Sequence, residues 1–343
     1  MMQLVHDFTP ARSFKHCLLC LTCILIYSTP SARTLQDISG QLTNEDTATT
    51  LYLAKEFITM NPDQPRAEVV AVRDGQFVAV GTLSEVKKRI GENALIDRRF
   101  ANKTVTAGFI EPHVHPVLAA ITMKTKVLSI EDWDTIDGFS PAIRDEKTYQ
   151  AALKQAIQAH EDKSVPFVSW GYHHYFHGKL SRTLLNELAP DFPVVIWHRS
   201  AHEFYLNDAA LALAKIDEAL IASLPAGVQK QIDFGKGHFY ESGAFGLLGN
   251  FASIIATPER FKQGLEYTER YYHEAGVTIA GEPGGFYSKV AQDAVNAVYS
   301  DDATPFNHCF IADGKSIYTI GEGNPERVIA ETENTLSWGD GRT

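Results

Sequence analysis

The 343-residue sequence predicts an α/β fold preceded by a small antiparallel β unit. After Thr104, helical patterns alternate with short apolar strands, as in EKTYQAALKQAIQAHED before VPFVSWG and LSRTLLNELAP before PVVIWHRS. This alternation is typical of a parallel sheet with crossover helices. The β unit is indicated by the runs LYLAKEFITM, AEVVAVRD and QFVAVG, and Asp74-Gly75 between the last two suits a tight hairpin.

The composition is that of a globular protein with an acidic surface. Hydrophobic residues make up 44% of the chain and charged residues 21%, which is enough apolar material for a buried core. Acidic residues outnumber basic ones by 42 to 31, giving a formal net charge of −11. This balance argues against nucleic acid or an anionic membrane surface as the main partner. The partner that we expect is a small-molecule substrate.

The first residues have the pattern of a signal peptide over 1–32. Arg12 and Lys15 precede the apolar run CLLCLTCILIY, which is shorter than the ~20 residues needed for a stable membrane span, and small residues follow it. This predicts export to the periplasm or the cell exterior, whereas a true start nearer Leu51 would leave the protein cytoplasmic. Residues 33–50 are expected to be a flexible lead-in. Cys309, the one cysteine beyond residue 32, is expected to be buried.

The domain boundaries follow from the change of pattern near residue 103. We expect a small β-sandwich portion over 51–102, with one short helix from Ser84 to Gly91. The α/β part then covers 103–343, with strands near 104, 165, 193, 277 and 304.

Two histidines stand where the first of these strands ends. His113 and His115 lie in GFIEPHVHP, and residues two apart in an extended chain point to the same side. Neutral imidazoles at the carboxyl end of a barrel strand can bind a divalent metal, which would acidify a bound water. The spacing therefore favours a metal site, although packing histidines can have the same spacing.

Four stretches resemble amidohydrolase family 3: FITMNPDQPRAEVVAVRDGQFVAVG, TVTAGFIEPHVHP, PVVIWHRSAHEFYLNDAALALAKI and EAGVTIAGEP. The resemblance covers about residues 51–343. It implies a partial TIM-type (β/α) barrel behind an incomplete composite β-sandwich, and a metal-dependent hydrolase of carbon–nitrogen bonds other than peptide bonds. By the same resemblance, His113 and His115 hold the metal, for which zinc is expected, and Arg199 and His202 lie near the substrate.

The sequence departs from that family in its extent. Five β/α strands are recognised where a closed barrel needs eight, and the downstream ligands are missing. We therefore expect the N-terminal portion of a longer protein, with open barrel edges that favour self-association. The alternative function is a catalytically inactive, truncated amidohydrolase-like protein, and a more distant one is an exported binding module.

Glu241, Glu282 and His308 are further candidates for the metal site. Glu241 in GHFYESGAFG is expected to add a carboxylate ligand, although its glycine neighbours also fit a plain loop. Glu282 ends a predicted strand, where it could contact metal or substrate. His308 lies within a predicted strand, where a core histidine is the commoner role.

Aromatic residues and histidines mark a predicted substrate-lining loop. His174 lies in GYHHYFHG, where histidines alternate with tyrosine and phenylalanine, and this favours contact with an apolar substrate. Trp170, at the end of the preceding strand, is a candidate for the same wall, with core packing as the alternative.

Overall fold

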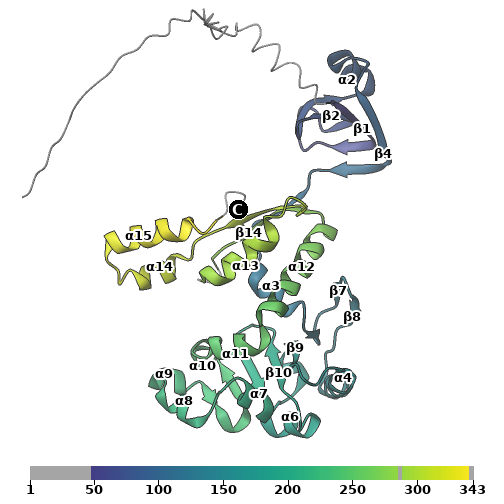
Figure 1. Cartoon of the computed structure of the whole chain (residues 1–343). Helices are drawn as coiled ribbons and strands as arrows, with labels where there is room; N and C mark the ends of the chain where they lie inside the picture. The colour runs from purple at the N-terminus through teal and green to yellow at the C-terminus, as the bar shows by residue number, and fades with distance from the viewer. Residues whose placement is uncertain (1–47, 285–287, 340–343) are drawn as a thin grey trace, which may run out of the picture. The chain divides into compact units, whose positions relative to one another are not determined.

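The computed structural model describes residues 48–284 and 288–339, which form parts of two compact units, Met1–Thr106 and Ala107–Thr343 (Figure 1). The predicted signal peptide and residues 33–47 of the predicted lead-in lie outside the described residues. Within the described ranges, each helix is too short or too polar to span a bilayer.

The first unit contains a four-stranded sheet in the order β3-β2-β1-β4. β1 and β2 pair antiparallel, as do β2 and β3, whereas β1 and β4 are parallel. The predicted hairpin turn is present, with positive φ at Asp74 (52°) and Gly75 (71°). The elements of this unit are β1 (Thr50–Ile58), β2 (Arg66–Arg73), β3 (Gln76–Gly81), α2 (Leu83–Ile90) and β4 (Leu95–Thr106).

The predicted short helix exists but begins earlier than expected. Its N-cap is Thr82 rather than Ser84, because the Thr82 hydroxyl accepts from the Glu85 backbone N–H while the Glu85 carboxylate accepts from the Thr82 N–H at 2.9 Å. This reciprocal capping box satisfies two otherwise unpaired donors. The buried Val86 then packs against Leu51 and Val69 of the sheet.

The strand predicted from Thr104 is divided between two sheets. Thr104 and Thr106 belong to β4, where they pair with Glu56 and Ile58 of β1. The next strand, β5 (Phe109–Glu111), pairs instead with β14 of the second unit. The prediction of one continuous strand was wrong, because the first half of the segment pairs in parallel with β1 and the second half pairs with β14.

The second unit has a mixed α/β architecture with several sheets. The largest has the order β12-β13-β11-β10-β9-β6, a three-stranded sheet has the order β15-β14-β5, and β7 pairs with β8. Parallel pairing is confined to β6-β9-β10 and to β15-β14-β5. The strands predicted for one barrel are therefore spread over two sheets, and the described residues form no closed barrel.

The elements of the second unit follow one another as short strands and helices. Up to β10 they are β5 (Phe109–Glu111), α3 (Pro116–Thr122), β6 (Lys126–Val127), β7 (Trp133–Thr135), β8 (Gly138–Ser140), α4 (Glu146–Ala159), β9 (Phe167–Tyr172), α5 (His174–His177), α6 (Arg182–Leu188) and β10 (Val194–His198). The rest are β11 (Glu203–Leu206), α7 (Asp208–Leu213), α8 (Glu218–Ser223), α9 (Ala226–Gln229), β12 (Ile232–Asp233), η1 (Phe234–Lys236), β13 (His238–Tyr240), α10 (Ser242–Phe245), α11 (Leu248–Ile255), α12 (Pro258–Glu274), β14 (Val277–Glu282), α13 (Lys289–Tyr299), β15 (Asn307–Phe310), α14 (Gly314–Ile320) and α15 (Pro325–Leu336).

Strand β10 is the centre of the larger sheet, and all five of its residues are buried. Val195 and Trp197 pack into one apolar cluster with residues of α7 and α11, whereas Val194 and Ile196 pack into another with residues of α4 and α6. These helices surround β9 and β10 in Figure 1. Alternate side chains of a strand point to opposite faces, so this sheet is covered on both sides.

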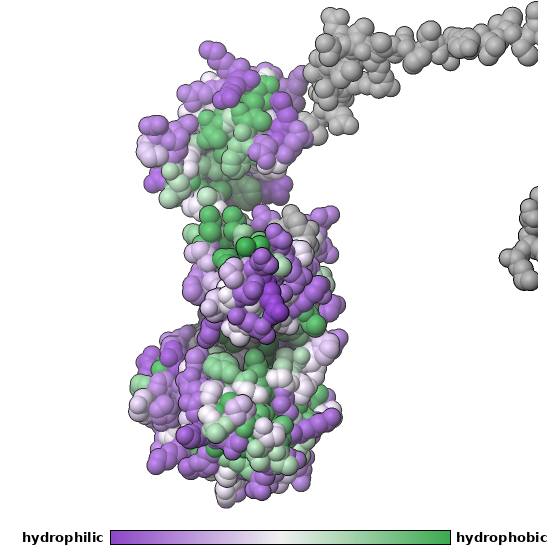
Figure 2. Space-filling view, turned by 90° about the vertical axis from the view of Figure 1, so that its left-hand side faces the viewer, coloured by the Kyte–Doolittle hydropathy of each residue, from purple (hydrophilic) through white to green (hydrophobic). Residues whose placement is uncertain are grey.

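The three-stranded sheet packs against α3, α12 and α13. α3 and α12 approach so closely that a Cβ on Gly264 would lie 1.9 Å from the Ala120 carbonyl oxygen. Cys309 is exposed, contrary to expectation, because its neighbour His308 occupies the covered face of β15. On the face of the molecule seen in Figure 2, hydrophilic and hydrophobic residues are interspersed.

Candidate functional site

His113 and His115 follow β5 directly, and His115 is the N-cap residue of α3, with Pro116 at the first helical position. Their ring centroids are 5.3 Å apart and the rings are nearly perpendicular, at 86°. His113 is exposed and His115 is partly buried. The two imidazoles therefore lie close enough to act on one small ligand.

Glu282 joins this pair from the neighbouring strand. β14 runs parallel to β5, so the carboxyl ends of both strands lie at the same edge of the sheet. The Glu282 side chain is buried, and its Oε1 lies 2.9 Å from His115 Nδ1. With Nδ1–H donating to the carboxylate, the lone pair of His115 remains on Nε2, which is the arrangement that metal-binding histidines use.

The donor set fits a divalent metal in part. His115 has a fixed tautomer and His113 lies beside it, which supplies two nitrogen ligands. Among the described residues, no group of three histidine, cysteine or carboxylate ligand atoms within 4.8 Å of one another includes His113 or His115. Water or substrate would have to complete the coordination of an ion held here.

The structure does not bring Glu241 to these histidines. Glu241 follows β13, and its Oε2 lies 3.1 Å from His202 Nδ1. The reason is the antiparallel register of β11 and β13, which pairs Glu203 with Tyr240 and so places Glu241 opposite His202. The third-ligand hypothesis for Glu241 therefore has no geometric support, whereas Glu282 is in contact with the site.

Arg199 and His202 lie in the turn between β10 and β11. Arg199 forms an ion pair with Glu131, and its backbone N–H donates to the Tyr172 carbonyl at 2.9 Å. His202 and its partner Glu241 are both exposed. Both predicted substrate contacts are thus accessible side chains paired with carboxylates at the carboxyl end of the larger sheet.

The predicted substrate-lining loop forms the short helix α5, and its histidines differ in role. His177 is fully buried, stacks on Tyr149 at 4.1 Å between ring centroids and contacts the Ile143 carbonyl at 2.7 Å. It is a core residue. His174 is exposed and lines a cavity of about 330 Å³ together with Glu203 and His238. His174 is therefore the histidine of α5 that a ligand in this cavity could reach.

Trp170 and His308 have the surroundings of packing residues. The Trp170 ring meets the Trp133 ring edge-on at 5.0 Å and packs against the core cluster of the larger sheet. His308 is buried in β15, with its ring 5.5 Å from that of Tyr299. A larger cavity of about 830 Å³ lies elsewhere, near the start of β9, and is lined by residues of α4 and α12.

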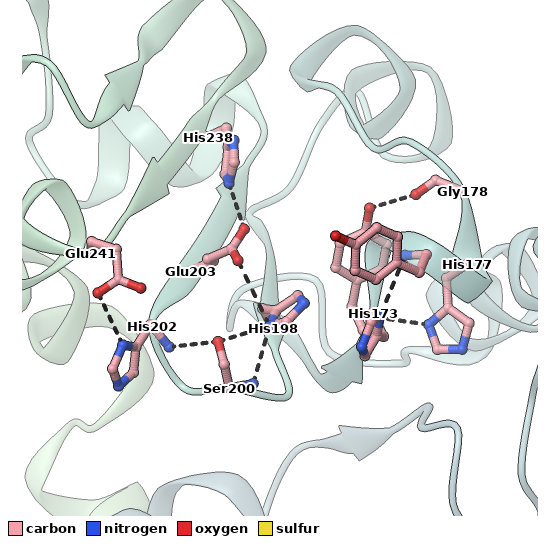
Figure 3. A network of polar contacts seen from close by, with 11 residues as sticks. His173, His177, Gly178, His198, Ser200, His202, Glu203, His238 and Glu241 are labelled. Atoms are coloured by element: carbon pink, nitrogen blue, oxygen red, sulfur yellow. Dashed lines mark hydrogen bonds and ion pairs between the residues drawn. The ribbon is translucent and has the colours of Figure 1, made fainter.

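His198 is a functional candidate that the sequence reasoning missed. It ends the buried strand β10, and its Nδ1 lies 2.8 Å from Ser200 Oγ and 4.0 Å from Glu203 Oε1 (Figure 3). The other oxygen of Glu203 contacts His238 Nε2 at 2.9 Å. Burial lowers the pKa of His198 to about 4, and the hydrogen bond from His238 lowers the pKa of Glu203. A histidine at the end of a buried strand is the signal that identified His115, and it applies equally here.

Comparison with known proteins gives distant relatives only. No family model matches the chain. It is 26% identical over 259 residues to the exoenzymes regulatory protein AepA of Pectobacterium carotovorum subsp. carotovorum, covering 73% of this chain and 52% of that protein. It is 28% identical over 160 residues to N-substituted formamide deformylase of Arthrobacter pascens, covering 44% of this chain and 26% of that protein. A third relative, LONG AFTER FAR-RED 3 of Arabidopsis thaliana, is 20% identical over 230 residues, or 67% of this chain and 37% of that protein.

Two solved structures share the fold. Both are described as uncharacterized metal-dependent hydrolases, from Pyrococcus horikoshii (TM-score 0.56) and Pyrococcus furiosus (TM-score 0.55), and each is 14% identical to this chain. The matches cover 80% and 81% of this chain but 51% and 53% of those proteins. The chain thus spans about half the length of these structures and of AepA, and the likeness at this identity establishes the fold.

Proposed function

We propose that the protein is a metal-dependent hydrolase of the amidohydrolase family 3 type, which acts on carbon–nitrogen bonds other than peptide bonds. The observation that carries the proposal is the contact of His115 with the buried Glu282, at the shared edge of two parallel strands. His113 and His115 would hold the divalent ion, for which zinc suits the imidazole ligands. The names of the two solved structures and of the deformylase support the same class of reaction.

The chain's own residues position the reacting groups. Glu282 is held by a strand that is paired on both sides, so its carboxylate fixes the orientation and tautomer of His115. Arg199 and His202 would bind polar groups of a small-molecule substrate. A bound divalent ion would polarise the amide oxygen and lower the pKa of a water molecule. In this proposal, the parallel strands β6-β9-β10 and β15-β14-β5 of the second unit are arcs of one open (β/α) barrel.

The test is hydrolysis of an N-substituted formamide by the purified full-length chain after dialysis against Zn²⁺, with formate release as the readout. We expect turnover in the native sequence and its loss in H113A/H115A. E282Q should lower zinc affinity by about 10- to 100-fold, because loss of a residue that orients a ligand histidine typically weakens metal affinity by that factor. The matched control is H273A, which replaces an exposed histidine of α12.

Two outcomes would contradict the proposal. Turnover that survives in H113A/H115A would place the chemistry elsewhere in the protein. Zinc binding that depends on His113 and His115 without turnover of any amide would favour the catalytically inactive alternative.

A further inference from the structure

Three histidines of the second unit converge at a place that is separate from His113 and His115. His173 and His174 follow β9, and His198 ends the adjacent strand β10. Their ring centroids form a nearly equilateral triangle, with sides of 5.4, 5.4 and 5.5 Å. One ligand-type nitrogen from each ring lies within 4.8 Å of the other two.

His198 is the buried member of the triangle, with 4% of its surface exposed. Its Nδ1 faces Ser200 and Glu203, whereas its Nε2 is buried and has no hydrogen-bond partner among the described residues. Figure 3 shows His198 between this polar pair and His173. A buried nitrogen without a partner costs free energy, on the order of 1 to 3 kcal/mol, unless a ligand satisfies it.

The other two histidines are held by the start of α5. His173 is the N-cap residue, and its Nδ1 accepts from the Tyr175 backbone N–H at 3.3 Å. An ion at Nε2 would replace this long hydrogen bond, because the ring proton would then move from Nε2 to Nδ1. His174, the first residue of the helix, is exposed. The three nitrogens lie within 4.8 Å of one another, and rotations of the His173 and His174 side chains would have to bring them to the separation of ~3.4 Å that a tetrahedral ion with Zn–N bonds of about 2.0 to 2.1 Å requires.

We propose that His173, His174 and His198 form a second metal site, for a transition-metal ion of the zinc type. Three neutral imidazoles suit Zn²⁺ and related ions, whereas Mg²⁺ and Ca²⁺ require oxygen ligands.

The surroundings of the triangle complete the site. The Ser200 backbone N–H donates to His198 Nδ1 at 3.1 Å, and Ser200 Oγ lies 2.8 Å from the same nitrogen. An ion at Nε2 would therefore select the other tautomer of His198, in which Nδ1–H donates to Ser200 Oγ. Of the three histidines, His174 lines the cavity of about 330 Å³, whose wall also includes Glu203, His238 and two lysines, Lys179 and Lys236. Three protein ligands next to such a cavity leave a fourth position for water or a small ligand, as in an open zinc site.

The experiment counts zinc ions in the full-length chain by equilibrium dialysis and elemental analysis, with affinity measured by competition against a chromophoric chelator. H113A/H115A removes the site of the proposed function, and we expect this variant to retain one Zn²⁺. Adding H174A should lower the affinity for that remaining ion by more than about 100-fold, since loss of even a residue that only orients a ligand lowers metal affinity by about 10- to 100-fold. Zn²⁺ should also raise the melting temperature of H113A/H115A but not of the triple variant.

H273A in the H113A/H115A background is the control, and we expect it to keep the ion. The proposal is overturned if H113A/H115A binds no zinc, if H174A leaves the affinity unchanged, or if H273A weakens binding as much as H174A does. Should H113A/H115A fail to fold, H174A alone must lower the zinc count of the native sequence by one. Hydrolytic activity enters none of these readouts, so failure of the proposed function remains distinguishable.

Discussion

The two main sheets of the second unit place their histidines in opposite environments. β10 in the larger sheet is buried along its whole length, and His198 at its end is buried with it. β5 is at the edge of the three-stranded sheet, Phe109 and Ile110 are 62% and 64% exposed, and His113 beyond it is exposed. Histidines stand at the end of β10 and just after β5, and burial lowers the pKa of His198 to about 4. The burial of a histidine depends on the covering of its sheet rather than on its position at a strand end.

The largest expected effect comes from replacing one isoleucine of each sheet by alanine and comparing the loss of stability. Ile196 of β10 is fully buried, so I196A should lower the free energy of unfolding by about 3 kcal/mol, within the usual range for such truncations. Ile110 of β5 is mostly exposed, and I110A should change it by less than about 0.5 kcal/mol. Denaturant unfolding of both variants measures the difference, and equal losses would remove the contrast between the sheets.

The packing of α3 against α12, which holds the helix that follows His113 and His115, is tested by G264A. A Cβ at this position would collide with the Ala120 carbonyl and force α3, whose N-cap residue is His115, away from α12. We expect a loss of about 2 kcal/mol, because overpacking outweighs the better helix propensity of alanine. G249A, at an open position of α11, is the control. A G264A protein as stable as the native sequence would show that α3 can shift at no cost.

The pH dependence of stability tests the burial of His198. Its pKa is about 4 in the folded protein against an ordinary value of 6.5, so the unfolded chain binds more protons between these limits. Stability should be highest above pH 6.5 and fall by up to ~1.4 kcal/mol per pH unit as the pH drops toward 4. His173 and His177 act in the same direction, because burial lowers the pKa of each.

Chemical unfolding in a chelating buffer between pH 6.5 and pH 5 measures this slope, and H198Q should reduce it. H273A should not alter it. A slope that H198Q leaves unchanged would mean that His198 is protonated as readily in the folded protein as in the unfolded chain.

The smallest expected effect concerns the open edge of the three-stranded sheet. We propose that β15, which pairs on one side only among the described strands, supports weak self-association. C309K places a charge on an exposed edge position and should shift the concentration-dependent sedimentation of the reduced protein toward the monomer. Identical sedimentation of both proteins would exclude β15 as the contact.

Local signals predicted the local structure well. The Asp74-Gly75 hairpin, the short helix before residue 91 and the strands near 165, 193, 277 and 304 are present, because turn residues, caps and apolar runs act within a few positions. The errors arose where distant strands compete. Residues 104–106 pair with β1 rather than continuing into β5, and the pairing of β11 with β13 places Glu241 beside His202.

The sequence by itself determined the α/β class, the strand that ends before His113 and His115, and the carboxylate of Glu282 at the end of another strand. Only the tertiary structure decided which of these residues meet. Glu282 reaches His115 because β14 pairs with β5, and His198 joins His173 and His174 because β10 pairs with β9. The physical reason is that strand pairing joins segments far apart in the chain, and their choice of partner depends on the burial of whole sheets, which short-range patterns do not encode.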